Sequence, residues 1–237
     1  MGDRDTAAVL VAGGTGERFG RSSGKQLALL AGRPVVAYSL DACTGVARVG
    51  LVVVVCHPDR VSEYAEALGT GLSGVEVLFV AGGPRRQDSV AAGLAKVPDA
   101  FEYVAVHDGA RPLAGPALFN AALDALDDEP RLTGVVVGHP SVDTLKTVHD
   151  ALVTSTPDRS RFWAVQTPQV FRSDALRVAY AKAVAGGREG TDDASLVEAA
   201  GGTVGVVEGP RDNIKVTLAE DLAVAEALLA ARGEGGT

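Results

Sequence analysis

Hydrophobic residues in this chain gather in short, nearly continuous runs, and these runs alternate with stretches of helical periodicity. Runs that are apolar throughout, without regular polar positions, are typical of strands buried on both faces of a sheet. The predicted strands cover residues 7–12, 49–56, 75–80, 103–107, 134–138 and 203–207. The predicted helices cover residues 35–42, 59–68, 87–95, 116–126, 173–184, 192–199 and 222–231. This alternation predicts an α/β fold with a mostly parallel sheet and helices on both of its faces.

The last predicted helix has the clearest boundaries. Thr217 and Glu220 have the spacing of a capping box, in which two side chains bond to backbone N–H groups at the helix start. Gly233 follows the apolar run 222–231 and is a typical stop signal. We therefore expect a helix that begins just after Thr217 and ends at Gly233.

Residues 139–156 depart from this pattern, because they show polar–apolar alternation and turn residues but no helical period. The alternation predicts a β-hairpin with strands at 144–148 and 152–156 that projects from the domain. A thin hairpin buries little surface by itself, so we expect it to pack on something else. It is either an ordinary surface excursion or a dimerisation arm covering residues 139–160.

Composition and charge exclude several function classes. With 46% hydrophobic residues and no linker, residues 1–237 are expected to form one folded domain. The net charge of −8 disfavours nucleic-acid binding, which needs a basic face. The longest apolar run is far shorter than a membrane span, and the start, MGDRDT, does not resemble a signal peptide. Cys43 and Cys56 are interpreted as reduced core residues. These features predict a cytoplasmic protein that binds neither nucleic acid nor membrane.

A glycine-rich segment follows the first predicted strand: residues 12–20 are AGGTGERFG and residues 24–26 are GKQ. Glycines after a buried strand let backbone N–H groups approach an anionic ligand, because no Cβ is in the way. Neither common phosphate-loop motif fits, since both need a glycine or alanine where Phe19 stands. The segment does supply two cations, Arg18 and Lys25, which suit the oxygens of a triphosphate. Taken alone, it indicates either a phosphate site or a glycine turn with two solvated cations.

Polar residues also follow two other predicted strands. Asp108 and Arg111 come directly after the strand 103–107 and form either a local ion pair or a pair that faces substrate and metal. Residues 82–89, GGPRRQDS, place two arginines and a serine at a helix start, where an anion or a base can bind.

Later polar clusters at 167–169, 191–193 and 212–217 lie at element boundaries, where helix capping is the default explanation. Lys215 is harder to explain in that way, because apolar residues flank it. The histidines show no metal-ligand spacing, and no nucleophile lies beside a plausible base. Chemistry that relies on cations and glycines suits transfer of a nucleotidyl group, where stabilising negative charge is most of the task.

Together these motifs resemble one family closely. AGGTGERFG–GKQ, GGPRRQDS, HDGARP, DRSRFWAVQTPQ, TDDAS and DNIKVT occur in that family's order along almost the whole chain. The family is the 2-C-methyl-D-erythritol 4-phosphate cytidylyltransferases, nucleotidyltransferases of Rossmann-like fold. The resemblance implies transfer of CMP from CTP to methylerythritol phosphate with release of diphosphate, a step of the non-mevalonate route to isoprenoid precursors. It also implies a divalent cation, usually Mg²⁺, and a homodimer whose arms embrace.

The resemblance further implies roles for individual residues. The residues that bind CTP would be Ala12, Gly13, Gly14, Gly16, Gly83, Ser89, Asp108 and Gly109, with Asp108 also the candidate metal ligand. The residues around methylerythritol phosphate would be Arg111, Thr144, Arg159, Thr167, Thr191 and Lys215. The catalytic cations would be Arg18, Lys25, Arg159 and Lys215. Such cations are needed because both reactants are anions.

Two positions depart from the family pattern, and two alternatives to the family's activity stay open. Pro84 stands where the family often has an acid, and Gly109 where it often has alanine. One alternative is a cytidylyltransferase for another polyol phosphate, such as ribitol 5-phosphate. The other is a nucleotide-binding protein without catalysis, since fold does not fix function. The presence of Lys25, Arg159 and Lys215 argues against the second alternative.

Overall fold

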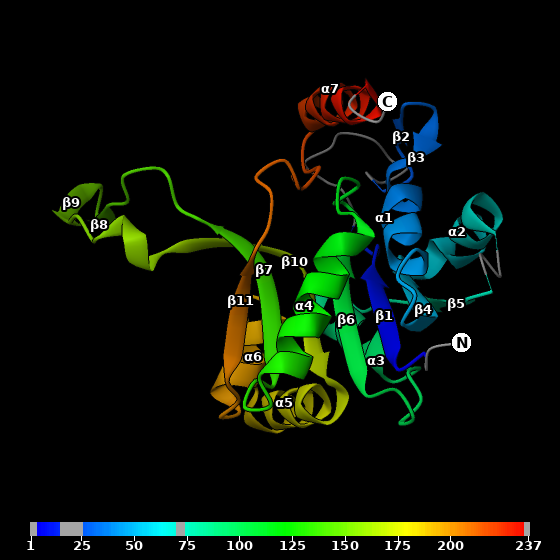
Figure 1. The fold of residues 1–237 in the computed structure, drawn as a ribbon, viewed down its shortest axis with the longest axis horizontal. Helices are drawn as coiled ribbons and strands as arrows, with labels where there is room; N and C mark the ends of the chain where they lie inside the picture. The colour runs from blue at the N-terminus through cyan, green and yellow to red at the C-terminus, as the bar shows by residue number, and fades with distance from the viewer. Residues whose placement is uncertain (1–3, 15–25, 70–73, 235–237) are drawn as a thin grey trace.

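The computed structural model describes residues 4–14, 26–69 and 74–234, which fold around a seven-stranded sheet (Figure 1). Its strands are β1 (Thr6–Val11), β4 (Val49–Cys56), β5 (Glu76–Ala81), β6 (Tyr103–Asp108), β7 (Gly134–Pro140), β10 (Trp163–Arg172) and β11 (Val204–Glu208). Their order across the sheet is β11-β7-β10-β6-β1-β4-β5. β10 runs antiparallel to both of its neighbours, and the other pairs are parallel. The sheet is therefore mostly parallel, which confirms the predicted fold class.

Helices cover both faces of this sheet. They are α1 (Val35–Thr44), α2 (Val61–Leu68), α3 (Arg86–Leu94), α4 (Pro116–Asp128), α5 (Ser173–Gly186), α6 (Asp193–Ala199) and α7 (Glu220–Glu234). Successive strand residues point to opposite faces, so Ala8 and Leu10 of β1 share a core with α1, α2 and α4. Ala7 and Val9 share the opposite core with α3, α5 and α6. The apolar runs of the sequence thus serve two cores, and each predicted helix is present.

The hydrophobic pattern does not predict β10, although this strand lies in the middle of the sheet. The reason is its polar content: Gln166, Thr167 and Gln169 are buried in the strand and form hydrogen bonds there. Buried polar residues whose bonds are satisfied are compatible with a central strand, but they erase the apolar signature of one.

α7 departs from the predicted helix at both ends. The helix begins at Glu220 rather than just after Thr217, so the capping box predicted from these two residues is wrong. Instead the carboxylate of Asp221 accepts hydrogen bonds from the backbone N–H of Thr217 at 2.6 Å and from its hydroxyl at 2.8 Å. The helix then continues through Gly233 to Glu234. It packs against a small hairpin formed by β2 (Leu29–Leu30) and β3 (Arg33–Pro34).

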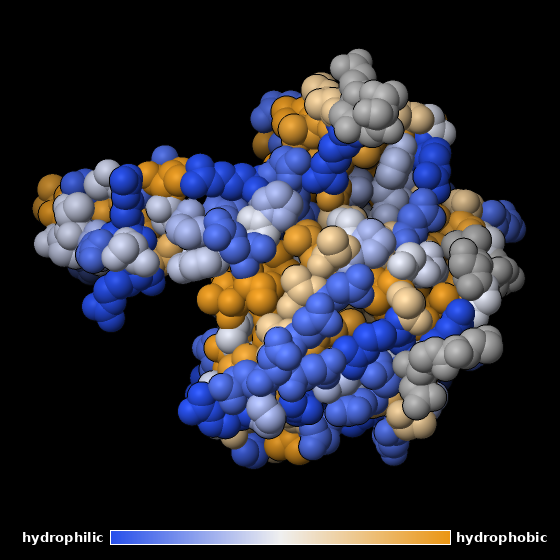
Figure 2. Space-filling view, viewed as in Figure 1, coloured by the Kyte–Doolittle hydropathy of each residue, from blue (hydrophilic) through white to orange (hydrophobic). Residues whose placement is uncertain are grey.

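An arm between β7 and β10 extends away from the body of the molecule (Figure 1). It carries the predicted hairpin, formed by β8 (Thr147–His149) and β9 (Leu152–Ser155). The backbone N–H of Ser141 donates to the carbonyl of Phe162 at 2.9 Å and closes the arm at its base. Hydrophobic side chains stand exposed on the hairpin: Val148, Leu152 and Val153 are 56%, 71% and 61% exposed. Figure 2 shows orange, hydrophobic residues on this projecting arm.

The two cysteines lie in the core, as predicted. Cys43 in α1 and Cys56 at the end of β4 are both buried and free. Burial raises the pKa of the Cys56 thiol to about 12 and also raises that of Cys43, so both thiols are protonated at neutral pH. Within the described ranges, no helix is both long enough and apolar enough to cross a membrane.

Candidate active site

The carboxyl ends of β1, β4, β5 and β6 meet at one edge of the sheet, where open α/β sheets bind their ligands. A cavity of about 630 Å³ lies at this edge, and we call it the first pocket. The described residues that line it are Val11, Gly13, Gly14, Gln26, His57, Pro58, Gly82, Gly83, Pro84, Arg85, Arg86, Ser89, Asp108, Ala110 and Lys215. This volume suits a nucleotide-sized ligand, and the glycines leave backbone groups accessible to it.

Close packing explains two glycines of the first pocket, Gly83 and Gly13. A Cβ on Gly83 would lie 2.4 Å from the Cβ of Asp88, and one on Gly13 would lie 3.3 Å from the carbonyl oxygen of Cys56. The hydroxyl of Ser89 accepts a hydrogen bond from the backbone N–H of Gly83 at 3.2 Å. This bond joins the turn after β5 to the first turns of α3 and so helps to shape this wall of the pocket.

Asp108, the last residue of β6, is surrounded by cations. Its Oδ2 lies 2.7 Å from the Nζ of Lys215 and 4.0 Å from the Nε of Arg111, and its Oδ1 lies 3.2 Å from the Nε of Arg86. The Asp108 side chain is 9% exposed. Burial alone raises the pKa of this carboxyl, but Arg86, Lys215 and Arg111 outweigh burial and hold it well below its usual range. Asp108 is therefore ionised, and the three cations are held around it.

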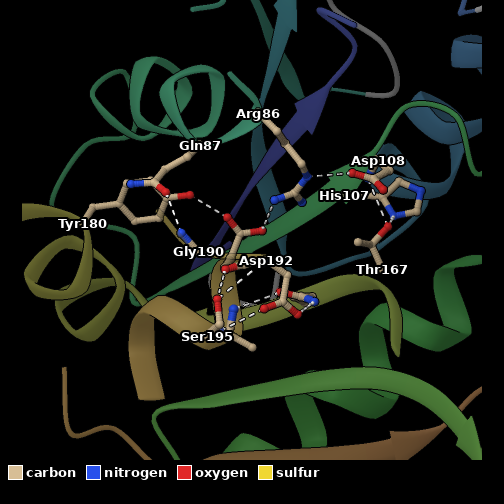
Figure 3. Close-up of polar contacts among 12 residues, drawn as sticks. Arg86, Gln87, His107, Asp108, Thr167, Tyr180, Gly190, Asp192 and Ser195 are labelled. Carbon is tan, nitrogen blue, oxygen red and sulfur yellow. Dashed lines mark hydrogen bonds and ion pairs between the residues drawn. The ribbon is translucent and has the colours of Figure 1, made fainter. Parts of the chain in front are cut away.

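Arg86 joins Asp108 to a second buried carboxylate. Figure 3 shows the Arg86 side chain directed toward Asp108. Its Nη1 lies 2.9 Å from the Oδ2 of Asp193, whose side chain is only 1% exposed. The hydroxyl of Tyr180 donates to the other oxygen of Asp193 at 2.5 Å. Burial raises the pKa of Asp193, and the charge of Arg86 opposes that rise. The guanidinium thus spans two carboxylates that come from different parts of the chain.

A second, smaller cavity of about 170 Å³ lies beside the first, and we call it the second pocket. It is lined by Arg86, Asp108, Arg111, Val165, Gln166, Thr167, Gln169, Thr191, Asp192 and Lys215. Arg86, Asp108 and Lys215 line both pockets. Two ligands bound in the two pockets would therefore meet at these three side chains.

The position of Lys215 depends on its neighbour Asn213, which is fully buried. The side-chain amide of Asn213 donates to the Thr167 carbonyl and to the Gln166 side chain, each at 3.0 Å. The Nη1 of Arg111 donates to the Asn213 carbonyl at 2.7 Å. These bonds tie the segment before α7 to the middle of β10 and to the residues after β6, which places Lys215 at the boundary between the pockets.

Thr167 forms hydrogen-bond contacts with both Asp108 and its neighbour His107. The hydroxyl of Thr167 accepts a hydrogen bond from the backbone N–H of Asp108 at 3.0 Å and also lies 3.0 Å from the Nδ1 of His107. Burial lowers the pKa of His107 to about 4, so this imidazole is neutral at pH 7. Neutral His107 therefore adds no charge to the cluster around Asp108.

The structure brings together many of the residues singled out in the sequence. In the first pocket lie Gly13, Gly14, Gly83, Ser89, Asp108 and Lys215, and in the second lie Arg111, Thr167, Thr191 and again Asp108 and Lys215. Ala12 and Gly109 do not line either pocket: Ala12 is fully buried, and the backbone N–H of Gly109 donates to the carbonyl of Val11 at 2.9 Å. Gly16, Arg18 and Lys25 lie outside the described residues.

Two of the expected substrate-binding residues lie on the arm instead. Thr144 and Arg159 are exposed, and neither lines the two pockets of its own chain. The Nη1 of Arg159 donates to the carbonyl of Val142 at 2.5 Å, within the arm.

Arg86 and Asp193 were not among the site residues predicted from the sequence. Arg86 could have been singled out, because it starts a helix directly after β5, at the edge where ligands bind. Asp193 has no comparable signal. Its neighbour Asp192 caps α6 through the backbone N–H of Ser195, which confirms the capping interpretation of this cluster.

Comparison with known proteins links nearly the whole chain to one group of enzymes. A family model described as 2-C-methyl-D-erythritol 4-phosphate cytidylyltransferase matches residues 6–231. The chain is 42% identical over 225 residues to the enzyme of that name from Parasynechococcus marenigrum, which covers 94% of this chain and 97% of that one. It is 40% identical to the corresponding enzyme from Alkaliphilus metalliredigens, over 96% of this chain and 94% of that one.

Solved structures agree with these sequence relatives. The 4-diphosphocytidyl-2C-methyl-D-erythritol synthase of Anaerococcus prevotii superposes with a TM-score of 0.83 at 29% identity, over 95% of this chain and 98% of that one. The 2-C-methyl-D-erythritol 4-phosphate cytidylyltransferase of Thermus thermophilus superposes with a TM-score of 0.74 at 33% identity, over 93% of this chain and 97% of that one.

Proposed function

Because the chain belongs to the 2-C-methyl-D-erythritol 4-phosphate cytidylyltransferase family, we propose that it transfers CMP from CTP to 2-C-methyl-D-erythritol 4-phosphate. The products are 4-diphosphocytidyl-2-C-methyl-D-erythritol and diphosphate. The observation that carries this proposal beyond family membership is the pair of adjoining pockets that share Arg86, Asp108 and Lys215. CTP occupies the larger pocket and the polyol phosphate the smaller one.

The reaction is an in-line substitution at the α-phosphorus of CTP. A phosphate oxygen of the acceptor forms the new P–O bond, and the bond to the diphosphate breaks and takes its electron pair with it. The attacking phosphate is already ionised, so the reaction needs no general base. Catalysis then consists of holding two anions together and stabilising the charge that develops between them.

Among the residues that the structure describes, Lys215 is the cation best placed for that task. It lies at the boundary of the two pockets, 2.7 Å from Asp108, and its side chain is 38% exposed. Arg86 and Arg111 add positive charge to the second pocket. Such local concentration matters because the net charge of the chain is −8. Arg18 and Lys25 complete the proposed set on the CTP phosphates.

The described residues offer few protein ligands for the proposed Mg²⁺ ion. Within the described ranges, no group of three or more His, Cys, Asp or Glu residues could hold a metal ion. Asp108 lines both pockets and is ionised, but its two oxygens are paired with Lys215 and Arg86, so it would serve as a single carboxylate ligand only if one of these pairs opened. Mg²⁺ is commonly bound by one or two carboxylates together with substrate phosphates. When bound, the ion would neutralise part of the triphosphate charge.

A diphosphate-release assay tests the proposed reaction. The protein is mixed with CTP and Mg²⁺, and either methylerythritol phosphate, ribitol 5-phosphate or no acceptor is added. Release that depends on methylerythritol phosphate is the expected result. Faster release with ribitol 5-phosphate would assign the chain to the alternative cytidylyltransferase activity, and no release with either acceptor would contradict catalysis.

We also propose that the arm forms a homodimer in which each arm completes the second pocket of the partner. Support comes from the exposed Val148, Leu152 and Val153 on a hairpin that has no core of its own. Exposed apolar clusters of this kind are typical of protein interfaces. Thr144 and Arg159 lie on the same arm, outside both pockets of their own chain.

Mixing two inactive variants, Lys215→Ala and Arg159→Ala, tests this arrangement under conditions of subunit exchange. If the two residues serve one site from different chains, half of the dimers are mixed and carry one intact site, so about a quarter of the activity returns. Lys215→Ala mixed with Asp108→Asn is the matched control, because these two residues contact each other within one chain. No recovery in the first mixture, with exchange verified, would place Arg159 in the site of its own chain.

A further inference from the structure

The loop between α5 and α6 carries Thr191. Two side-chain hydrogen bonds to this loop come from a residue at the start of α3. Gln87 accepts a hydrogen bond from the backbone N–H of Gly190 at 3.0 Å through its Oε1. Its Nε2 donates to the carbonyl of Arg188 at 3.2 Å. Figure 3 shows the Gln87 side chain directed toward Gly190. One side-chain amide thus holds two backbone groups immediately before Thr191.

Other contacts fix the far side of the same loop. The Gln169 side chain of β10 donates to Asp192 at 2.8 Å and accepts from the backbone N–H of Ala194 at 3.1 Å. Thr191 therefore lies between two anchors, Gln87 before it and Gln169 after it. Gln169 itself lines the second pocket, whereas Gln87 lines neither the first pocket nor the second. Gln87 can therefore act on a ligand in the second pocket through the loop that it holds.

The hydrogen bonds that hold the start of α3 beside the first pocket do not involve Gln87. Ser89 holds Gly83 through its hydroxyl, and the carboxylate of Asp88 bonds to Arg85 through both the backbone N–H and the guanidinium. Loss of the Gln87 amide leaves these bonds in place. The two pockets are therefore expected to respond differently to a change at this position.

We propose that Gln87 is a positioning residue for the second substrate: it holds residues 188–190 so that Thr191 is aligned in the second pocket. This inference rests on the proposed binding of the polyol phosphate in that pocket. A hydrogen-bonding amide is required, because both an acceptor and a donor are used. Without it, the loop must be ordered by the incoming substrate, and that ordering weakens substrate binding.

Gln87→Met tests the proposal, since methionine matches the length of glutamine and favours helices but cannot form either bond. We expect the KM for methylerythritol phosphate to rise by about five- to tenfold, the effect of losing one or two neutral hydrogen bonds. The KM for CTP and the kcat should stay within about twofold of the wild type. Lys96→Met is the matched control, because it removes an exposed polar side chain just beyond the other end of α3. It should leave all three constants unchanged.

Two results would overturn the positioning role. One is an unchanged KM for methylerythritol phosphate in Gln87→Met. The other is a parallel rise in both KM values together with a fall in Tm of more than about 4 °C, which would indicate a general structural role. Failure of the proposed function is distinguishable from both, because the wild type itself would then release no diphosphate with methylerythritol phosphate.

Discussion

Replacing Arg86 with methionine should weaken the fold substantially, because two buried carboxylates share this guanidinium. Arg86 Nη1 lies 2.9 Å from Asp193, which is almost fully buried, and Arg86 Nε lies 3.2 Å from Asp108. Removing one partner of a buried ion pair destabilises a protein by about 3–5 kcal/mol. Asp108 keeps Lys215 and Asp193 keeps Tyr180, and the Arg86 side chain is 31% exposed, so the lower end applies. We expect a loss of about 3 kcal/mol.

Thermal unfolding measures this loss directly. For a chain of this length, 3 kcal/mol corresponds to a fall in Tm of roughly 6–12 °C. The double variant Arg86→Met with Asp193→Asn should recover part of that loss, because an amide has no charged form that would have to be buried without a cation. A double-mutant cycle of these two positions isolates their coupling from the other effects of each substitution.

The Tm deficit of Arg86→Met should depend on pH in a direction set by the pKa of Asp193. The folded-state pKa of Asp193 is already raised by burial, and removing Arg86 raises it further. A carboxyl with a raised folded-state pKa favours the fold below its unfolded pKa and loses that contribution as the pH rises. The Tm deficit of Arg86→Met should therefore be larger at about pH 8 than at about pH 5. A deficit below about 2 °C, or one that does not change with pH, would refute this explanation.

Three further predictions concern the pockets and the core. Lys215→Ala should lower kcat by about 10²–10³, as measured by diphosphate release. Its fall in Tm should be smaller than that of Arg86→Met, because Arg86 and Arg111 still neutralise Asp108 and only one buried carboxylate loses a partner. Near-normal kcat would mean that this cation only neutralises Asp108. CTP should be preferred over UTP by at least about 10² in kcat/KM, because a pocket that pairs with the cytosine amine leaves polar groups unsatisfied with uracil. Comparable rates with the two nucleotides would contradict the CTP specificity of the proposed function. Gly93→Ala should destabilise the protein by about 1–3 kcal/mol in urea unfolding. Its Cβ would lie 2.6 Å from a methyl group of Val9 and 2.8 Å from one of Val55, so an unchanged midpoint would show that the core yields there.

The parallel part of the fold could be predicted from the sequence because its strands are apolar on both faces. β1 and β4 show this most clearly, with Ala7 to Leu10 and Leu51 to Cys56 buried throughout. β10 could not be found in this way, because it carries buried glutamines whose partners come from distant segments. Hydrogen bonds between residues far apart in the chain leave no periodic signal in the sequence.

The residues of the candidate site could also be predicted only in part from the sequence. Asp108 and Lys215 were identified from short motifs, and the structure brings them within 2.7 Å of each other. Their partner Arg86 was seen only as one of two arginines at a helix start. Asp193 was hidden within a helix-capping cluster, since a sequence does not reveal which of two adjacent acids turns inward. The roles of the arm residues Thr144 and Arg159 stay predictions.

The closure of the arm at its base also bears on how this fold can vary. β7 and β10 are antiparallel neighbours, and the bond from Ser141 to Phe162 ends their pairing where the arm leaves the body. The arm is therefore an insertion in a hairpin connection, and its length affects the folding of the body only through loop-closure entropy. Each doubling of such a loop adds only about 0.6 kcal/mol. Insertions, deletions and substitutions in the arm can therefore accumulate together with changes in the surface that the arm contacts. The strand ends that hold the pockets keep their register at the same time.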